Sequence, residues 1–186
     1  LRAELVSVYG TDHGLSEVHW MSRFTDATRL ADRYRHGRVL LAGDAAHTHP
    51  PQGGQGLNTG LQDAVNLGWK LAAVVQGRRD DDLLDTYDAE RRPVAQRVLD
   101  NTLAQVVLTS GGDRHRAMRD CLTRLATVDE VRHRLMAELC ALDIRYDIAD
   151  ASEPDPHPIV GRRMPDLDVD LAREHGASRV HELLHA

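Results

Sequence analysis

The chain has 186 residues, of which 41% are hydrophobic and 28% are charged, so it can bury a core over most of its length and is not a disordered tail. Its formal net charge of -6 gives no reason to expect a nucleic-acid partner. The sequence shows no apolar run of the roughly 20 residues that span a bilayer and no signal peptide, so we expect no membrane partner and a cytoplasmic location. Cys121 and Cys140 lie in helical patterns and are expected to be free thiols.

The first part of the chain predicts short strands around one helix. Residues 1–9 and 17–24 are typical of strands separated by a glycine-containing turn, and residues 25–34 are typical of a short polar helix. Residues 38–42 form an apolar run between glycines, which indicates a strand buried on both faces in a parallel sheet. A long loop over residues 43–57 follows.

Helices are predicted from residue 58 onward. In the first helix, which ends at Gly77, apolar spacings of three and four define one face: Leu61, Val65, Gly68, Leu71, Ala72 and Val75. A second helix begins after residues 80–82, and Pro93 is expected to break or kink it before a continuation to about residue 109. A third helix is expected over residues 114–143, with a buried stripe of Leu122, Leu125, Val128, Val131, Leu135 and Leu139.

The composition changes near the end of the chain. Residues 151–161 contain three prolines and predict an extended linker. Residues 164–171 alternate as in a strand, and residues 178–186 predict the start of a helix or loop. Because the sequence begins with Leu1 and its last residues are too few to close a domain, we expect a piece of a longer protein.

The stretch "VLLAGDAAHTHPPQGGQGLN" permits two readings, and the first is a metal site. Asp44, His47 and His49 form a D-x-x-H-x-H cluster of residue types that bind zinc. A metal-dependent hydrolase would need further ligands at the ends of later strands. The sequence favours this reading only weakly, because His115 and His133 each stand between two arginines.

The second reading is a cradle for a nucleotide cofactor. Asp44 would place a carboxylate at the end of a strand, where α/β folds bind ligands. Gly53, Gly54 and Gly56 would let backbone approach a flat ligand, and free N–H groups would open the helix that follows. The stretch does not match the dinucleotide fingerprint, since residue 59 is threonine, and a glycine-rich surface loop is the plainer alternative.

A longer segment, "GRVLLAGDAAHTHPPQGGQGLNTGLQDAVNLGWKLAAVVQG", resembles the second flavin-binding segment of the group A FAD-dependent aromatic monooxygenases, which have the p-hydroxybenzoate hydroxylase fold. It is most similar to actinomycete polyketide hydroxylases. Their G-D motif matches Gly43-Asp44, and their P-x-x-G-x-G-x-N motif matches Pro51, Gly54, Gly56 and Asn58. The match continues through "LLDTYDAERRPVAQRVLDNT", and "HPIVGRRMPDL" resembles the entrance to a thioredoxin-like C-terminal domain.

The resemblance implies a cofactor site for FAD. Asp44 would bind the ribityl hydroxyls, the loop from Pro51 to Gly56 would line the isoalloxazine edge, and the N–H groups of Leu57 and Asn58 would face N1 and the C2 carbonyl. The full set of implied cofactor residues is Gly43, Asp44, Pro51, Gly53, Gly54, Gln55, Gly56, Leu57 and Asn58. Trp20 and Ser22 are candidates for the substrate pocket, with core packing as the alternative.

The implied activity is hydroxylation of an aromatic substrate, a polycyclic polyketide-type phenol of antibiotic biosynthesis, with NAD(P)H as transient reductant and O2. FAD carries this chemistry, so no catalytic side chain is required. The resemblance also implies that the N-terminal G-x-G-x-x-G unit for the ADP half of FAD, and most of the substrate domain, are missing. We therefore expect the C-terminal part of the enzyme, inactive by itself, whose partners are the missing N-terminal part and a small aromatic substrate.

The implied fold class is α/β, a fragment of the FAD-binding fold with a helical extension and the start of a thioredoxin-like domain. We expect residues 1–36 to end the substrate domain, 37–110 to belong to the FAD-binding domain, 111–150 to form the extension, and 151–186 to hold the linker and the truncated domain. A flavin-dependent halogenase or epoxidase, a metal-dependent hydrolase, a non-enzymatic fragment and a homo-oligomer are left open. For a halogenase, Lys70 in a helix is a poor candidate for the reactive lysine.

Overall fold

The computed structural model describes residues 1–22, 25–148, 157–168 and 179–184. Its helices are α1 (Arg2–Tyr9), α2 (Gly56–Val75), α3 (Asp85–Thr109), α4 (Asp113–Leu125), α5 (Asp129–Leu139) and α7 (Val180–Leu184). Its strands are β1 (Arg29–Leu30), β2 (Arg35–His36), β3 (Val39–Leu40) and β4 (His47–Thr48). Short 3-10 helices cover Gly43–Ala45, Gln52–Gly54 and Asp81–Leu84. Within the described residues, no helix is both long and apolar enough to cross a membrane.

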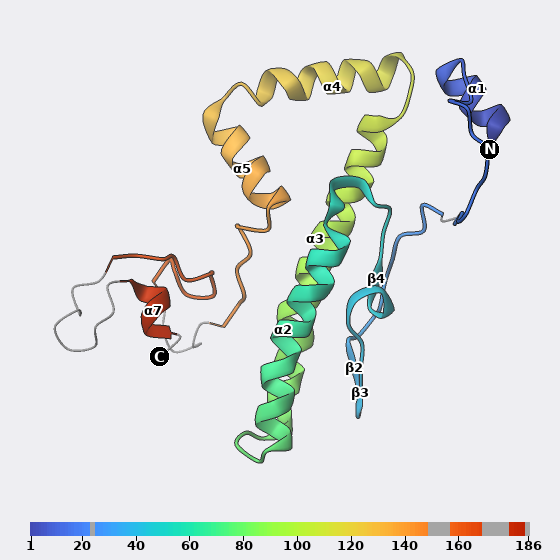
Figure 1. Ribbon diagram of the computed structural model, residues 1–186. Coiled ribbons are helices and arrows are strands. Elements are labelled where there is room, and N and C mark those ends of the chain that lie inside the picture. The colour runs from blue at the N-terminus through green and yellow to red at the C-terminus, as the bar shows by residue number, and fades with distance from the viewer. Residues whose placement is uncertain (23–24, 149–156, 169–178, 185–186) are drawn as a thin grey trace.

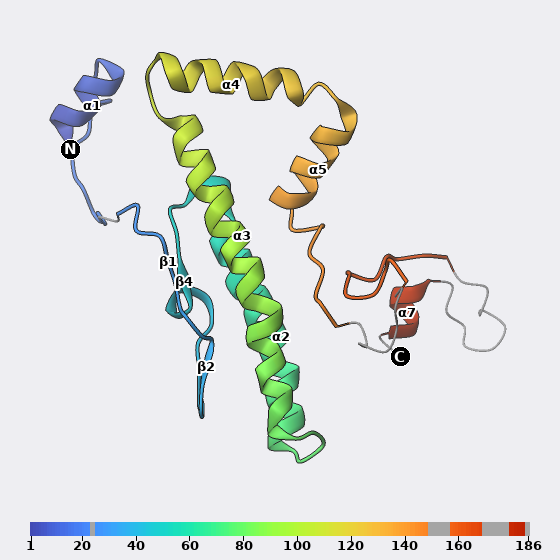
Figure 2. The same ribbon diagram turned by 180° about the vertical axis from the view of Figure 1, so that it is seen from behind.

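Helices α2 and α3 lie side by side along most of their length, and the strands run beside them (Figures 1 and 2). Strand β1 pairs with β4 and β2 pairs with β3, both antiparallel. The buried core lies where this strand segment meets the two helices, and it consists of Tyr34, Ala46, Tyr87 and Ala95. The Tyr87 hydroxyl donates to the carbonyl oxygen of Leu41 at 2.8 Å, which ties α3 to the segment that leads into the glycine-rich stretch.

The N-terminal elements differ from those predicted. Residues 2–9 form helix α1 rather than a strand, and this helix ends at Gly10, whose left-handed backbone accommodates the turn. Residues 17–22 contain no strand, and residues 23–24 lie outside the described part. Residues 25–34 contain no helix, because Arg29 and Leu30 pair with Thr48 and His47 instead. That pairing joins residues far apart in sequence, so local helix propensity did not reveal it.

The strand predicted over residues 38–42 is shorter and differently paired. Only Val39–Leu40 is a strand, and it folds back on Arg35–His36 through a turn at Gly37, which has a φ of 60°. A glycine in the left-handed region closes such a hairpin readily. The parallel pairing expected for this run is therefore absent among the described residues.

Helix α2 agrees with the sequence pattern, and Gly77 follows its end with a φ of 67°. Its apolar face is largely open to solvent, since Leu61, Val65 and Val75 are 61%, 67% and 77% exposed. The buried side of the helix is instead polar and faces α3: Thr59, Asp63, Asn66 and Lys70. The ammonium group of Lys70 lies 2.8 Å from the carboxylate of Glu90 on α3.

Helix α3 runs through Pro93 as one helix, so of the break or kink expected there the break is wrong. The helix is held on both sides of the proline by buried residues, among them Arg91, Val94 and Ala95. The single helix expected over residues 114–143 is divided into α4 and α5. The division falls at Val128, whose extended backbone caps α5 ahead of Asp129 and Glu130, acids that suit the first turn of a helix.

The stripe that the sequence assigned to the core of this region is mostly exposed. Leu125, Val128 and Leu135 are 49%, 52% and 43% exposed. Helix α4 extends away from the α2–α3 pair before α5 turns back toward α3 (Figure 1). Both cysteines are free and exposed. Most of the expected linker and part of the expected strand at residues 164–171 lie outside the described residues. Of the helix or loop expected over residues 178–186, Val180–Leu184 is helical, as α7.

Candidate cofactor site

A hollow of about 280 Å³ lies between the end of β4 and the start of α2. Its lining consists of Asp44, Thr48, His49, Pro51, Gly54, Gly56 and Leu57. Asp44 is exposed and comes from the short 3-10 helix after β3, while Gly56 and Leu57 begin α2. Most of the residues that the sequence proposed for a cofactor cradle are thus brought together around one concave surface.

The glycines shape this hollow in different ways. Gly54 has a φ of 63°, a conformation that residues with side chains rarely adopt, and an added Cβ would meet nothing within 4 Å. Gly56 is helical, and a Cβ there would lie 3.5 Å from His49 Nε2, an ordinary contact. Gly54 is therefore required by the backbone, whereas the absence of a side chain at Gly56 keeps the hollow wide.

Two other residues predicted for the cofactor site, Gln55 and Gly53, hold the loop against α5 and α3. The Gln55 side-chain amide donates to the carbonyl oxygen of Leu139 at 2.9 Å, which ties the loop to α5. Gly53 packs so closely on Gln105 of α3 that an added Cβ would lie 2.8 Å from its amide nitrogen. Asn58 is exposed in the first turn of α2. The cofactor contacts predicted for these residues stay predictions.

The two candidates for the substrate pocket lie exposed on the surface. Trp20 is 81% exposed, and Ser22 is exposed as well. Both lie in a segment that forms no strand, although residues 17–24 were expected to form one. Their assignment to a substrate pocket stays a prediction.

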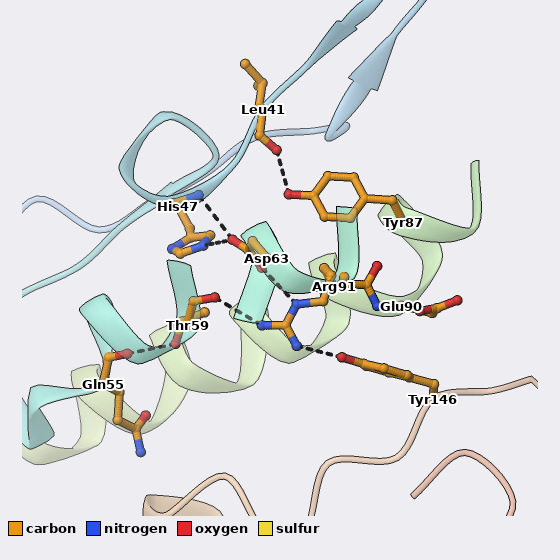
Figure 3. A network of polar contacts seen from close by, with 11 residues as sticks. Leu41, His47, Gln55, Thr59, Asp63, Tyr87, Glu90, Arg91 and Tyr146 are labelled. Atoms are coloured by element: carbon orange, nitrogen blue, oxygen red, sulfur yellow. Dashed lines mark hydrogen bonds and ion pairs between the residues drawn. The ribbon is translucent and has the colours of Figure 1, made fainter. Parts of the chain in front are cut away.

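Behind the hollow lies a buried polar network centred on Asp63 of α2 (Figure 3). Asp63 Oδ2 accepts a hydrogen bond from the backbone N–H of Gly43 at 3.1 Å and lies 2.7 Å from His47 Nε2. Asp63 Oδ1 accepts from Arg91 Nε at 2.8 Å. The network therefore fixes the turn that immediately precedes Asp44.

Two glycines allow this turn to approach α2. Gly43 has a φ of 57°, and a Cβ on Gly60 would lie 3.3 Å from the Gly43 Cα, which is tighter than most real contacts. A side chain at residue 60 would push the turn away from the helix. Gly60 was not singled out from the sequence, although it lies one helical turn before Asp63 on nearly the same face.

The electrostatics of Asp63 favour its charged form. Burial by itself would raise the pKa of this carboxyl, but the hydrogen bonds from His47, Arg91 and Gly43 outweigh burial and hold the pKa below its usual value. Arg91, which is fully buried, supplies the balancing positive charge. The network is thus a compensated ion pair rather than a reactive acid.

This lowered pKa predicts a loss of stability in acid. A carboxyl with a depressed folded pKa contributes its full stabilisation above its unfolded pKa, about 3.9, and loses that contribution as the pH falls through the folded value. We expect the free energy of unfolding of the full-length protein to decline below about pH 4. Urea unfolding should show that the free energy of unfolding declines less with falling pH in Asp63→Asn than in the wild type. An equal decline in the two proteins would contradict the lowered pKa of Asp63.

The structure does not bring the D-x-x-H-x-H residues together as metal ligands. His47 is buried against Asp63, whereas Asp44 faces the hollow and His49 Nδ1 lies 2.8 Å from the carbonyl oxygen of Pro50. In the described part of the chain, no group of three or more histidine, cysteine or acidic residues is arranged to hold a metal ion. The geometry therefore gives the metal reading no support.

The chemistry of the hollow fits a cofactor that carries hydroxyl groups beside an electronegative ring. Asp44 offers a carboxylate acceptor for hydroxyls. The first N–H groups of α2, a helix of 20 residues, have no acceptor within the helix and favour negative charge. The glycine loop leaves space between these acceptors and donors. Carboxylate, glycine loop and helix N-terminus are thus arranged as a cradle for a nucleotide cofactor would require.

The comparisons with known proteins give the same result. Residues 1–102 match the FAD binding domain family. The chain therefore belongs to this family, whose cofactor is FAD, and its fold is a fragment of the FAD-binding aromatic hydroxylase fold. This confirms the family resemblance and the cofactor expected from the sequence.

Three relatives illustrate the match. The 12-dehydrotetracycline 5-monooxygenase/anhydrotetracycline 6-monooxygenase of Streptomyces rimosus is 50% identical over 100% of this chain and 36% of the relative. Dialkyldecalin synthase of Streptomyces rugosporus is 43% identical over the same shares of the two chains. The crystal structure of CabE, an aromatic hydroxylase from angucycline biosynthesis, superposes with a TM-score of 0.88 at 47% identity, over 99% of this chain and 36% of that one. The chain thus spans about a third of the length of these relatives.

Proposed function

We propose that the protein to which these residues belong is an FAD-dependent monooxygenase that hydroxylates an aromatic, polycyclic polyketide-type substrate with NAD(P)H and O2. The observation that carries the proposal is the hollow in which Asp44, the glycine loop and the start of α2 converge, in a chain of the FAD binding domain family. Relatives named as a tetracycline-pathway monooxygenase and an angucycline hydroxylase support the substrate class.

In this proposal the chain holds the cofactor and orients it. Asp44 accepts hydrogen bonds from the cofactor's hydroxyls, and the first-turn N–H groups near Leu57 and Asn58 donate to the electronegative edge of its ring. Pro51, Gly54 and Gly56 form the wall against which the flat ring lies. When bound, FAD supplies the transfer of one oxygen atom from O2 to the substrate. The domain division predicted from the sequence, with FAD binding assigned to residues 37–110, is part of the proposal.

A second candidate function is a synthase on the same fold, which the similarity to dialkyldecalin synthase supports. A halogenase on this fold would need a lysine near the hollow as a reactive amine. The lysine of this chain, Lys70, is instead buried between α2 and α3 and paired with Glu90. Because the relatives include a monooxygenase and an aromatic hydroxylase, the hydroxylase is the better-supported proposal.

The test uses the purified full-length protein. We expect the visible absorption bands of oxidised flavin, consumption of NAD(P)H and O2 that is stimulated by a polycyclic phenol, and a product heavier by one oxygen atom. Bound FAD without substrate-stimulated NAD(P)H consumption would favour the synthase. Activity that is lost with a chelator, in a protein without flavin, would refute both.

A further inference from the structure

We propose that Tyr146 and Arg91 are positioning residues for the cofactor. In this view they hold Asp63 in place, Asp63 fixes the turn at Gly43, and this turn directs Asp44 into the hollow. Because Tyr146 lies after α5, beyond the residues that match the FAD binding domain family, the later part of the chain would set the affinity for FAD. The inference rests on the proposed function.

The first link joins Asp63 to the turn. The Gly43 N–H donates to Asp63 Oδ2 at 3.1 Å, and the left-handed backbone of Gly43 directs the chain into Asp44. The same oxygen lies 2.7 Å from His47 Nε2, so one carboxylate holds both ends of the short segment that contains Asp44. A shift of the carboxylate would therefore move the segment that carries the cofactor ligand.

The second link joins Arg91 to three partners. Its Nε donates to Asp63 at 2.8 Å, one terminal nitrogen donates to the carbonyl oxygen of Thr59 at 3.3 Å, and the other donates to the Tyr146 hydroxyl at 2.9 Å (Figure 3). Since the guanidinium is fully buried, each lost partner leaves a donor without water as a substitute. The Tyr146 hydroxyl thus helps to fix the orientation in which Arg91 meets Asp63.

The third link anchors Tyr146 itself. Its backbone N–H donates to the carbonyl oxygen of Gly161 at 2.8 Å. The neighbouring residue Arg145 forms an isolated antiparallel β-bridge, a backbone pairing, with Arg162. Gly161 has a φ of 78°, and a Cβ there would collide with the carbonyl oxygen of Tyr146. The backbone of Tyr146 is therefore held by close contact with Gly161, which lies at the end of the expected linker.

The alternative is that this network only stabilises the packing of α2 against α3. The two roles differ in one respect. If Tyr146 acts by directing Asp44, then its removal should lower FAD affinity only when residue 44 is an aspartate. If Tyr146 acts on packing alone, the loss of affinity should be the same whatever residue 44 is.

The test is a double-mutant cycle in the full-length protein, with FAD dissociation constants measured by titration of the apoprotein. We expect Tyr146→Phe to raise the dissociation constant about threefold to tenfold, the size of effect typical of residues that couple to a site at a distance. In the Asp44→Ala background the same substitution should change it little. Hydrogen exchange of the apoprotein should become faster in peptides that cover residues 40–48.

The matched control is Asp143→Asn. Asp143 pairs with Arg97 at 2.9 Å and so also connects α3 to the chain after α5, but it does not contact the Asp63 network. We expect it to leave the dissociation constant unchanged in both backgrounds. An unchanged affinity in Tyr146→Phe, or an equal loss in both backgrounds, would overturn the inference while leaving the proposed function standing. Failure of the wild-type protein to bind FAD would overturn the proposed function, and the inference with it.

Discussion

Replacing Arg91 by methionine is expected to lower the free energy of unfolding by about 3–5 kcal/mol. The side chains of Arg91 and Asp63 are both 0% exposed and lie 2.8 Å apart. Methionine retains much of the volume of arginine but leaves the carboxylate of Asp63 buried without its charged partner, which is far more costly than removing both charges. Urea unfolding of the full-length protein measures the difference.

Arg97→Met on the same helix is the control. Arg97 pairs with Asp143, but its side chain is 46% exposed, and pairs of that kind contribute about 0–1 kcal/mol. A loss in Arg91→Met no larger than the loss in Arg97→Met would show that the buried pair does not stabilise the fold. Asp63→Leu combined with Arg91→Met should recover part of the loss, since no unpaired charge then remains.

Asp44→Ala is expected to weaken FAD binding about tenfold to a hundredfold, since a hydrogen bond to a charged acceptor contributes roughly 1.5–3 kcal/mol. Asp44 is exposed and lies in the lining of the hollow, so its removal should leave the free energy of unfolding of the apoprotein unchanged. Titration of the apoprotein with FAD, followed by flavin fluorescence, gives the dissociation constant.

Asp82→Ala is the matched control for this substitution. It removes the same charge from an exposed position in the 3-10 helix that precedes α3. We expect Asp82→Ala to bind FAD as the wild type does. If Asp44→Ala retained wild-type affinity, Asp44 would not be a ligand for the cofactor's hydroxyls, and the hollow would need another occupant.

The part of the site that could be predicted from sequence is the part made by neighbouring residues. Asp44, Pro51, Gly54 and Gly56 lie within one short stretch, and Gly56 is the first residue of helix α2. Glycine spacing, a preceding carboxylate and a helix start are all local signals, so their convergence on one hollow could be inferred without the fold.

The network behind the hollow could not be predicted in the same way. Asp63, Arg91 and Tyr146 lie on separate segments, and no spacing rule links them. A partial signal was present, since Thr59, Asp63, Asn66 and Lys70 repeat at helical intervals and mark a polar face. The structure packs this polar face on α3.

The errors in the first part of the chain have a related cause. The segment expected to be helical over residues 25–34 pairs with β4, which is distant in sequence, and such pairing overrides local preference. The break between α4 and α5 did have a local signal, because Thr127 and Val128 are β-branched and two acids follow them. The long apolar periodicity outweighed that signal.

Because Lys70 is buried, separation of α2 from α3 can be detected by chemical modification of this side chain. The 186-residue sequence contains one lysine, Lys70. Its ammonium group is buried between the two helices beside Glu90. An amine-reactive reagent can therefore acylate this side chain only when the helices separate. The rate of acylation at Lys70, followed by mass spectrometry, therefore measures the rate of local opening at the back of the cofactor site.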